Sequence, residues 1–404
     1  MRVLVVGSGG REHALAWRLA SSPTLTKLHA APGNPGIATL ATCHPVAAED
    51  GDGLRELARS LAADLVVVGP EAPLVAGVAD TLRHAGIPVF GPSASAARIE
   101  GSKRFAKEVM AAAGVPTARL LDEPRAPCVL KADGLAAGKG VVVCRTDAEL
   151  EDALGEAGGH DRTMLVEELL DGPELSLLAL CDGREAISLA PARDYKRAHD
   201  GDEGPNTGGM GSFAPVAFDG DEADLVETCI RPVLAELADR GTPFVGTLFA
   251  GLMLAAAGPR VLEYNCRFGD PETQSVLPLV EGDLLEALAA AATGSLAGTS
   301  LDRRDGAAVT VVLAAGSYPA AGNRGTPIEG IEQAEASGAL VFHAGTALRG
   351  QRLVTNGGRI LGVTGTGATL TEARERAYAG CERIRFDGVQ YRRDIALAAA
   401  AALG

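Results

Sequence analysis

The chain has 404 residues, of which 47% are hydrophobic and 22% are charged, so it is long enough for about two or three domains with cores of their own. This balance excludes an intrinsically disordered chain. The net charge of −15 argues against nucleic acid or an anionic membrane as a partner, because both are bound by clustered lysines and arginines. Any anionic ligand must therefore be held by local glycine loops and a few cations.

The seven cysteines are scattered and include no Cys-x-x-Cys pair, which is typical of a reducing compartment and favours neither a zinc site nor a disulfide framework. The apolar stretch at residues 1–6 is too short for a signal peptide. The apolar tail at residues 395–403 is too short to span a bilayer. We therefore predict a cytoplasmic protein without a membrane partner.

The first hundred residues alternate apolar runs with helical stretches. Strands are expected at residues 3–6, 27–31, 65–68 and 87–90, each followed by glycine or proline turns. This alternation predicts right-handed crossovers and a parallel sheet, with the loops gathered at the carboxyl ends of the strands.

The turn at residues 7–10 places bare amides at a helix N-terminus, which favours an anion. The third glycine of a dinucleotide-binding motif is missing, because Glu12 stands at that position. We interpret the turn as a mononucleotide-like or sugar-phosphate loop, the alternative being a plain strand–helix turn.

A helix is predicted at residues 102–112, with Lys103 in its first turn, and the regular alternation of strands and helices ends after it. Strands at 128–131 and 141–144 flank the glycine-rich stretch 132–140, which is either a flexible loop over an anion or a mobile hairpin. Its spacing is not that of a Walker P-loop. A strand at 164–170 runs into acids and is followed by another strand at 175–181. Its backbone groups could bind the edge of a purine and its carboxylates the ribose hydroxyls. The alternative is an ordinary edge strand with a charged rim.

Residues 261–272 combine the end of a buried strand with acids, an amide and an arginine. The period of two places Glu263 and Asn265 on one face, where their oxygens suit Mg²⁺, and Arg267 follows with a guanidinium that suits a phosphate. The pattern Glu-x-Asn at a strand end is a weak signal by itself, and the alternative is a solvated strand end without a ligand. Further on, short strands at 307–315, 339–342, 352–355 and 359–363 and a helix at 370–384 predict a small α+β domain with a terminal helix after it.

Six motifs occur together in one order. They are GSGGREHA (7–14), GPEAPL (69–74), GSK (101–103), KADGLAAGKGV (131–141), GPNTGGMG (204–211) and EYNCRFGDPETQ (263–274). With these motifs the chain resembles the phosphoribosylamine-glycine ligases, also called glycinamide ribonucleotide synthetases, of the ATP-grasp group. The likeness runs from residue 1 to about 395, and the combination is far more specific than any single motif.

The resemblance implies a fold of mixed α/β and α+β class. It implies an N-terminal parallel α/β substrate domain over residues 1–101, an ATP-grasp domain over 102–304 with a lid at about 120–188, and a C-terminal α+β domain over 305–404. The implied reaction joins glycine to phosphoribosylamine with ATP through glycyl phosphate, in the second step of de novo purine synthesis. The implied cofactor is Mg²⁺ or Mn²⁺, and the expected assembly is a monomer or a weak homo-oligomer.

The resemblance also implies roles for individual residues. Catalytic roles would fall to Arg267, Lys131 and Lys103. ATP would be bound by Lys103, Lys131, Asp133, Gly138, Lys139, Gly140, Glu167, Glu168, Leu170 and Glu174. Glu263 and Asn265 would hold the metal. The other substrates would meet Gly9, Gly10, Arg11, Glu12, Asn34, Glu71, Asp194, Lys196, Asp270 and Glu272, with Asp194, Lys196, Asp270 and Glu272 around glycine.

Two other functions remain open from the sequence. One is an ATP-grasp carboxylase, or another carboxylate-amine ligase, of purine synthesis. The other is a regulatory protein that binds a nucleotide without catalysis, which the joint presence of Lys103, Lys131, Glu263, Asn265 and Arg267 disfavours.

Overall fold

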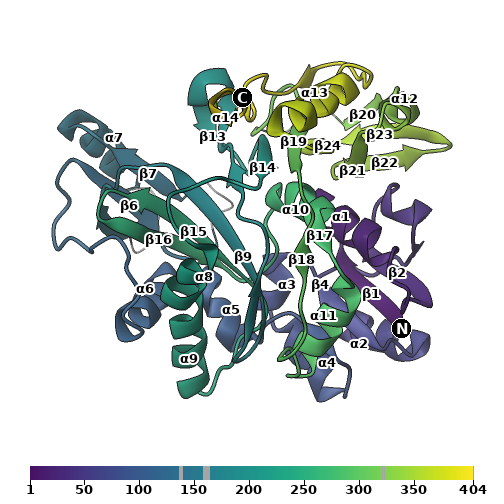
Figure 1. The fold of residues 1–404 in the computed structure, drawn as a ribbon, viewed down its shortest axis with the longest axis horizontal. Helices are drawn as coiled ribbons and strands as arrows, with labels where there is room; N and C mark the ends of the chain where they lie inside the picture. The colour runs from purple at the N-terminus through teal and green to yellow at the C-terminus, as the bar shows by residue number, and fades with distance from the viewer. Residues whose placement is uncertain (136–139, 158–163, 321, 323, 404) are drawn as a thin grey trace.

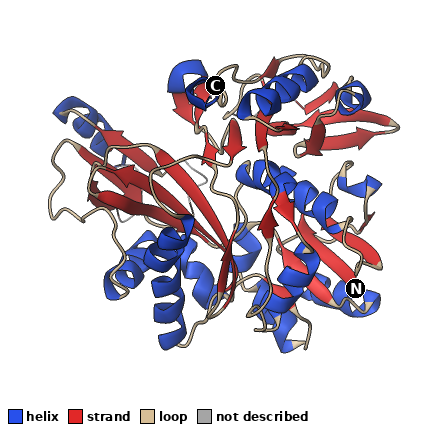
Figure 2. Cartoon of the chain, viewed as in Figure 1, coloured by secondary structure: helices blue, strands red, loops and turns tan. Residues whose placement is uncertain are grey.

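The structure is a computed structural model that describes residues 1–135, 140–157, 164–320, 322 and 324–403. It places a parallel sheet near the N-terminus, a lid of three strands on the opposite side, and the C-terminal region above both (Figure 1). Helices and strands are mixed through most of the chain, as Figure 2 shows. Across the described residues, no helix is long and apolar enough to cross a membrane.

The N-terminal sheet is parallel throughout and has the strand order β3-β2-β1-β4-β5, which confirms the predicted parallel arrangement. Its strands are β1 (Arg2–Gly7), β2 (Lys27–Pro32), β3 (Thr42–Cys43), β4 (Leu65–Val68) and β5 (Val89–Phe90). The helices of this region are α1 (Gly10–Leu19), η1 (Ile37–Thr39), α2 (Gly51–Leu61), α3 (Glu71–Val75), α4 (Val78–His84) and α5 (Ala94–Gly101).

The strands of this sheet read as continuous apolar runs because both faces are covered. In β1, Val3 and Val5 pack in one core with residues of α1 and α11 (Leu284–Ala292), whereas Leu4 and Val6 pack in another with residues of α2 to α5. One layer over the N-terminal sheet is therefore supplied by a helix nearly three hundred residues along the chain.

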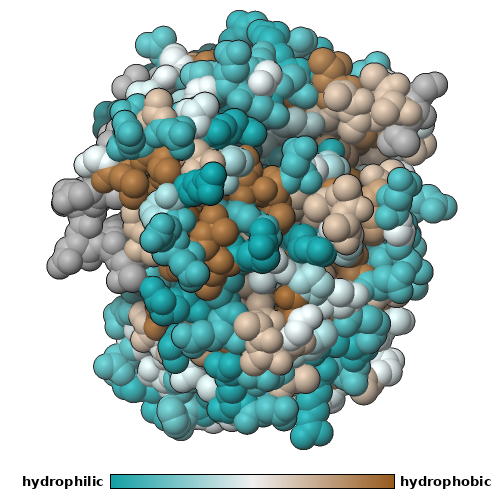
Figure 3. Space-filling model, turned by 90° about the vertical axis from the view of Figure 1, so that its left-hand side faces the viewer, coloured by the Kyte–Doolittle hydropathy of each residue, from teal (hydrophilic) through white to brown (hydrophobic). Residues whose placement is uncertain are grey.

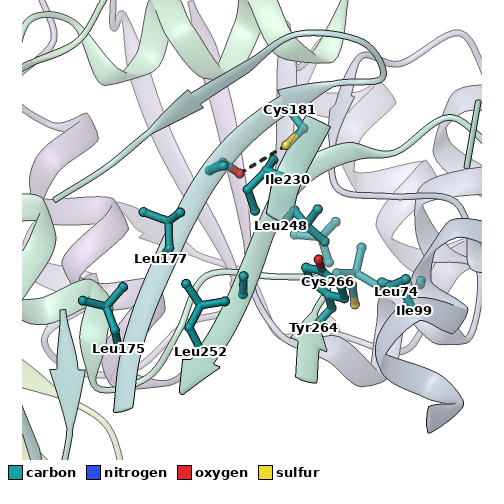
Figure 4. Close-up of a cluster of buried hydrophobic side chains, with 14 of the residues drawn as sticks. Leu74, Ile99, Leu175, Leu177, Cys181, Ile230, Leu248, Leu252, Tyr264 and Cys266 are labelled. Carbon is teal, nitrogen blue, oxygen red and sulfur yellow. Dashed lines mark hydrogen bonds between the residues drawn. The ribbon is translucent and has the colours of Figure 1, made fainter. Parts of the chain in front are cut away.

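The central antiparallel sheet has the order β10-β9-β15-β16. Its strands are β9 (Glu174–Asp182), β10 (Ala186–Ser188), β15 (Val245–Ala255) and β16 (Gly258–Asn265). Leucines of β9 and β15 form the buried cluster of Figure 4, in which Tyr264 and Cys266 lie beside Leu74 and Ile99. Because side chains alternate along a strand, burying Tyr264 leaves its neighbours Glu263 and Asn265 on the other face of β16.

The lid is a second antiparallel sheet of order β7-β6-β8, with β6 (Cys128–Ala132), β7 (Val141–Cys144), β8 (Met164–Glu168) and the helix α7 (Asp147–Ala157). Residues 116–121 join the two sheets: Thr117 bridges to Val261 of β16, and Leu120 bridges to Glu167 of β8. The strand predicted at 164–170 ends at Glu168, because the backbone of residue 168 pairs with this linker and then turns.

The lid has a small core, and apolar side chains therefore remain on its surface. The buried residues are Cys128, Leu130, Cys144, Leu150 and Ala153. The exposed apolar residues of the lid and its linker are Leu120, Leu135, Val142, Val143 and Leu154. Figure 3 shows apolar areas among hydrophilic ones on this side of the molecule.

Several short elements lie before, between and after the strands of the lid and the central sheet. They are α6 (Lys103–Ala112), which precedes the lid, and β11 (Arg193–Asp194), β12 (Arg197–His199), η2 (Asp200–Asp202), β13 (Glu203–Asn206), β14 (Gly211–Ala214), α10 (Glu272–Val276), η4 (Leu277–Leu279), β17 (Val280–Glu281) and β18 (Asp302–Arg303).

Residues 222–240 have the sequence pattern of one helix, which the structure forms in three parts. It consists of α8 (Glu222–Leu225), the π-helical segment η3 (Val226–Ile230) and α9 (Arg231–Asp239). Pro232 lies in the first turn of α9 and has no N–H to donate to the preceding turn, so the α-helical hydrogen-bond pattern is interrupted here.

The C-terminal region is the predicted α+β arrangement. Its elements are β19 (Ala307–Ala315), β20 (Arg324–Pro327), α12 (Ile331–Ala336), β21 (Leu340–His343), β22 (Thr346–Arg349), β23 (Arg352–Asn356), β24 (Arg359–Gly367), α13 (Leu370–Cys381), β25 (Val389–Gln390) and α14 (Leu397–Leu403). The helix predicted over 370–384 ends three residues earlier than expected.

The main C-terminal sheet has the order β11-β14-β19-β24-β21, with β25 also paired to β19. Two of its strands, β11 and β14, come from the stretch that the sequence assigns to the ATP-grasp domain. The sheet therefore crosses the boundary that we placed near residue 305.

Candidate active site

The candidate site forms where the carboxyl ends of β1, β2 and β4 meet the end of β16. The loop after β1 is tight: Gly7 has a φ of +127°, and a Cβ there would lie 2.6 Å from Cγ of Glu12. Such a conformation and such a close approach both require glycine. The turn thus brings the amides of Gly9 and Gly10 to the sheet edge at the start of α1.

Glu12 lies beneath this loop. Its side chain is 2% exposed, and its carboxylate accepts hydrogen bonds from the Gly9 amide at 2.6 Å and from Nε of Arg11 at 2.6 Å. Arg11 also donates to the carbonyl of Phe268 at 3.0 Å and lies 3.8 Å from Glu71. Glu12 therefore shapes the loop and holds Arg11, and it is Arg11 and Glu71 that face each other across the sheet edge.

Asn34, which follows β2, is buried and uses its amide on backbone groups. Nδ2 donates to the carbonyls of Ser8 and His343, both at 2.8 Å, and Oδ1 accepts from the amide of Ile37 at 2.9 Å. Both N–H groups are thus engaged. The contacts of Asn34 tie the two loops of the parallel sheet to the C-terminal region.

Arg267 lies at the centre of the site. It contacts Glu71 at 3.3 Å, Glu100 at 3.2 Å and the amide oxygen of Asn265 at 3.3 Å. Burial opposes its charge, but Glu100 and Glu71 outweigh burial and raise the pKa of the guanidinium. Arg267 therefore stays cationic with a fixed orientation, as recognition of a phosphoryl group requires. Glu100 was not among the residues predicted from the sequence.

Glu263 and Asn265 share one face of β16, as the period of two predicted. Burial opposes ionisation of Glu263, but Lys196, Lys131 and Arg267 together with a hydrogen bond from Asn265 lower its pKa. An ionised carboxylate beside an amide oxygen is a donor set that fits Mg²⁺ or Mn²⁺. The described residues contain no group of three or more His, Cys, Asp or Glu that could hold a metal, so the protein would supply few of the ligands.

Two lysines share one carboxylate under the lid. Glu167 is 2% exposed and lies 2.8 Å from Nζ of Lys131 and 3.1 Å from Nζ of Lys107. Lys131 also donates to the carbonyl of Leu262 at 2.8 Å, and Lys107 donates to Thr117 at 2.9 Å and to the carbonyl of Ala118 at 2.6 Å. Burial lowers the pKa of Lys107, although Glu167 opposes this shift. Lys107 was not among the predicted site residues.

Lys103 lies at the start of α6, next to the glycine-rich loop. Its amide donates to Asp133 at 2.7 Å and its Nζ donates to the carbonyl of Gly134 at 3.0 Å. Burial and the neighbouring Lys131 lower the pKa of Lys103, while Glu263 opposes that shift. Gly140 accepts a hydrogen bond from Ala132 at 2.7 Å, and Gly138 and Lys139 lie outside the described residues.

The stretch after β8 was predicted to meet the nucleoside. Glu168 points its carboxylate at Arg119, with a closest approach of 2.8 Å. Leu170 and Glu168 line a cavity of about 800 Å³ together with residues of the linker and Arg260. Glu174, at the start of β9, binds Nζ of Lys196 at 2.6 Å. The Glu174 side chain thus lies toward Lys196, one of the residues predicted to bind glycine.

Asp194, Lys196 and Glu272 form a charged group near Glu174 and Glu263. Burial opposes the charge of Lys196, but Asp194 and Glu174 outweigh it and raise the pKa of the ammonium. Burial and the Asp194 carboxylate raise the pKa of Glu272 to about 7. Glu272 is buried and accepts a hydrogen bond from Ser176 at 3.4 Å. The group can hold a cation or exchange a proton near neutral pH.

The C-terminal region reaches into the site through Arg359. This guanidinium contacts the Asp270 carboxylate at 3.1 Å and donates to the carbonyls of Asp270 and Gly208 at 2.7 and 2.5 Å. Tyr318 accepts from the amide of Gly208 at 2.8 Å. Burial opposes ionisation of Asp270, but Arg359 and Arg11 lower its pKa. Neither Arg359 nor Tyr318 was predicted from the sequence.

Three family models of phosphoribosylglycinamide synthetase match the chain. The N domain matches residues 1–100, the ATP-grasp (A) domain residues 101–273, and the C domain residues 308–398. The chain belongs to the phosphoribosylglycinamide synthetase family. The family resemblance seen in the motifs is thereby confirmed, as is the fold of parallel N-terminal sheet, ATP-grasp region and C-terminal region.

Relatives match along the whole chain. The phosphoribosylamine–glycine ligase of Streptomyces coelicolor is 54% identical over 100% of both chains, and that of Mesorhizobium japonicum is 49% identical over 98% of this chain and 97% of its own. The crystal structure of the Thermotoga maritima phosphoribosylamine–glycine ligase superposes with a TM-score of 0.85 at 37% identity, covering 98% of this chain and 100% of that one.

More distant structures share the fold alone. The biotin carboxylase domain of Hydrogenobacter thermophilus 2-oxoglutarate carboxylase covers 96% of this chain and 91% of its own, with a TM-score of 0.70 at 20% identity. Family membership therefore rests on the closer relatives, and the shared fold extends well beyond them.

Proposed function

We propose that this chain joins glycine to phosphoribosylamine at the expense of ATP, with glycyl phosphate as the intermediate and glycinamide ribonucleotide, ADP and phosphate as products. Family membership along the whole chain supports this reaction. The observation that carries it is the meeting of Glu263, Lys131, Lys196 and Arg267 at the end of β16, opposite the glycine turn of the parallel sheet.

ATP lies under the lid in this proposal. Lys131 and Lys103 contact its phosphates. The backbone of residues 167–170 meets the adenine, and Glu174 meets the ribose. Glu263 and Asn265 would hold a divalent cation, which would neutralise phosphate charge when bound. The buried Glu167 accepts from Lys131 and fixes the direction of its ammonium.

The first chemical step is attack of a glycine carboxylate oxygen on the γ-phosphorus of ATP, which releases ADP. Arg267 faces the phosphoryl group and stabilises the negative charge on its oxygens with N–H donors of the guanidinium. Asp194 and Glu272 hold the glycine ammonium, and Lys196 lies beside the carboxylate that is activated. These contacts lower the barrier chiefly by positioning and by charge neutralisation.

The second step is attack of the sugar amine on the acyl carbon of glycyl phosphate. The C–N bond forms, inorganic phosphate leaves, and the amine loses a proton. Gly9, Gly10 and Arg11 bind the anionic sugar, with Glu71 beside its polar groups, and Asp270 stays among the residues proposed for glycine. The proposed part of Glu12 and Asn34 is to shape the loops that hold the sugar, because their side chains are engaged with Arg11 and with backbone groups.

The deciding measurement is ADP release with Mg²⁺ and ATP, comparing glycine plus freshly generated phosphoribosylamine with each of them omitted in turn. Release that needs both substrates supports the ligase. Release that ignores glycine would refute it and would withdraw the residues placed around glycine. Bicarbonate-dependent release without glycine would move the reaction to the carboxylases.

The metal assignment is tested by Glu263→Gln, with Glu281→Gln, an exposed glutamate of β17, as the control. We expect the first substitution to remove most turnover without unfolding the protein and the second to leave turnover unchanged. Near-normal turnover of the Glu263 variant at saturating Mg²⁺ would refute the assignment. Weakened Mg²⁺ binding, measured by calorimetry with ADP, provides a readout independent of turnover.

A further inference from the structure

Residues 193–197 present two different faces. Asp194 and Lys196 belong to the charged group of the candidate site, and Lys196 contacts Glu174 at 2.6 Å. Tyr195, between them, is directed elsewhere: its hydroxyl accepts a hydrogen bond from the amide of Ala396 at 2.9 Å. The residues that face the site are thus carried by a segment whose other face rests on the C-terminal tail.

Arg392 is the centre of that contact. Its side chain is 1% exposed, and its guanidinium carbon lies 4.8 Å from the centroid of the Tyr195 ring. It donates two hydrogen bonds to Asp394, at 2.7 and 2.6 Å, and one to Asp202 at 2.7 Å. A further N–H reaches the carbonyl of Arg197 at 3.2 Å. One guanidinium therefore joins the tail to β12 and to the η2 turn of the β12–β13 hairpin.

Backbone contacts reinforce this junction. Asp394 accepts from the amide of Gly201 at 2.9 Å, and Asp200 accepts from the amide of Arg393 at 2.7 Å. On the side of the site, the carbonyl of Lys196 accepts from the amide of Thr207 at 2.8 Å. The hairpin is thus held by the tail at its tip, while its base adjoins the residues of the site.

A buried arginine is a costly way to fill space. Removing a guanidinium from water is repaid only where its partners have good geometry, and an apolar side chain of similar volume often gives equal or greater stability. The advantage of arginine is that its planar guanidinium donates several hydrogen bonds in fixed directions and so holds several acceptors in place at once. Arg392 does not touch the candidate site, so any effect on the reaction must pass through the hairpin.

We propose that Arg392 is a positioning residue that sets the placement of Asp194 and Lys196 for glycine. This proposal rests on the function assigned to these two residues above. The C-terminal tail thereby controls how well glycine is held, without contacting any substrate. The groups proposed for the phosphates and the metal lie on α6, β6 and β16, and on the nucleotide side it is Glu174, the proposed ribose contact, that pairs with Lys196.

The test compares three variants. Asp202→Asn removes the hairpin's charged partner, and because the Asp202 side chain is 69% exposed the fold should tolerate the change. Arg392→Met removes every hydrogen bond of the guanidinium and leaves the contacts of Asp394 and Asp200 with backbone amides. Arg374→Met is the matched control: Arg374 also donates to tail carbonyls, those of Arg393 and Ile395, but makes no contact with the hairpin.

We expect the KM for glycine to rise by about tenfold in Asp202→Asn and further in Arg392→Met, because small displacements of positioned groups have large kinetic effects. ADP affinity, measured by calorimetry, should fall by much less than the KM for glycine rises, because Glu174 adjoins Lys196 but the phosphate-binding lysines do not contact the hairpin. Arg374→Met should lower thermal stability without raising the KM. An unchanged KM in Asp202→Asn, or an equal rise in Arg374→Met, would overturn the proposal.

Hydrogen exchange separates this proposal from the proposed function. The amides of Tyr195 and Thr207 donate to Gly211 and Lys196, and their exchange should accelerate by about tenfold in Asp202→Asn but not in Arg374→Met. This readout needs no substrate. Accelerated exchange without glycine-dependent turnover in the unsubstituted protein would retain the positional link and refute the function assigned to Asp194 and Lys196. Unchanged exchange would refute the link itself.

Discussion

Glu167 and Glu168 are adjacent carboxylates in very different surroundings, and replacing each in turn by glutamine isolates the effect of burial. Glu167 is 2% exposed and lies between Lys107 and Lys131, whose side chains are 7% and 9% exposed. Glu168 is 26% exposed and pairs with Arg119, whose side chain is 77% exposed. The first change leaves two buried ammoniums without their carboxylate, whereas the second breaks a pair that water screens.

The expected costs follow from these surroundings. Breaking a buried ion pair by removing one partner costs about 3–5 kcal/mol. Removing an exposed pair costs about 1 kcal/mol or less. Glu167→Gln should also lower the pKa of Lys107 further, since Glu167 opposes the shift that burial causes. ATP affinity should fall in this variant because Lys131 loses the partner that fixes its ammonium.

Native-state hydrogen exchange of the amides in β6 and β8 measures the local free energy of opening, and calorimetry with ATP gives the affinity. Glu167→Gln should open these strands far more readily than Glu168→Gln does. Equal opening free energies in the two variants, or unchanged ATP affinity in Glu167→Gln, would refute the reasoning that the buried carboxylate organises both lysines.

Three further outcomes are expected. Arg359→Met should reduce kcat/KM by at least about tenfold, because Asp270 and Gly208 lose their shared partner; a loss of stability with unchanged steady-state kinetics would contradict this. Asn34→Ala should lower the unfolding free energy by about 2–3 kcal/mol, since three buried hydrogen bonds are lost; a loss below about 1 kcal/mol would be inconsistent with it. Burial lowers the pKa of His343 from 6.5 to about 4, so the unfolded chain takes up a proton at a higher pH than the folded chain does. The stabilisation from the neutral imidazole is therefore complete above pH 6.5 and is lost as the pH falls toward 4. At about pH 5 the free energy of unfolding should be about 2 kcal/mol lower than above pH 6.5. His343→Gln should remove that acid-side slope and the exposed His84→Gln should retain it, as urea titrations across pH can establish; equal slopes in both variants would refute the assignment.

Much of the fold could be predicted because it depends on patterns between residues that are close together in the sequence. The runs of valine and leucine in β1 and β4 have no polar interruption, and each ends in a glycine turn, which is typical of a parallel sheet covered on both faces. The alternation at residues 263–266 correctly separated the site face of β16 from its buried face. The order of the six motifs was sufficient to identify the family.

The residues that sequence reasoning missed depend on contacts between distant parts of the chain. Glu100 ends α5 and shows no local feature that points to Arg267, and Arg359 lies in an ordinary strand of the C-terminal sheet. Only tertiary packing brings these partners together. Lys107 could have been found, because it follows Lys103 by four residues in a helix and the two share a face. The short strands β11 and β14 were missed since they are too brief for a period of two to emerge.

The shared sheet of the C-terminal region constrains how the protein is made and how it can be taken apart. Strand β14 is complete when just over half of the chain has been made, but its neighbour β19 leaves the ribosome nearly a hundred residues later. Until then the edge of β14 has no permanent partner, so a nascent chain of about 300 residues carries an unpaired strand beside its unfinished catalytic centre. A cut near residue 305 would likewise divide a sheet instead of releasing a module, and exchanging C-terminal regions between relatives would require β11 and β14 to be exchanged with them.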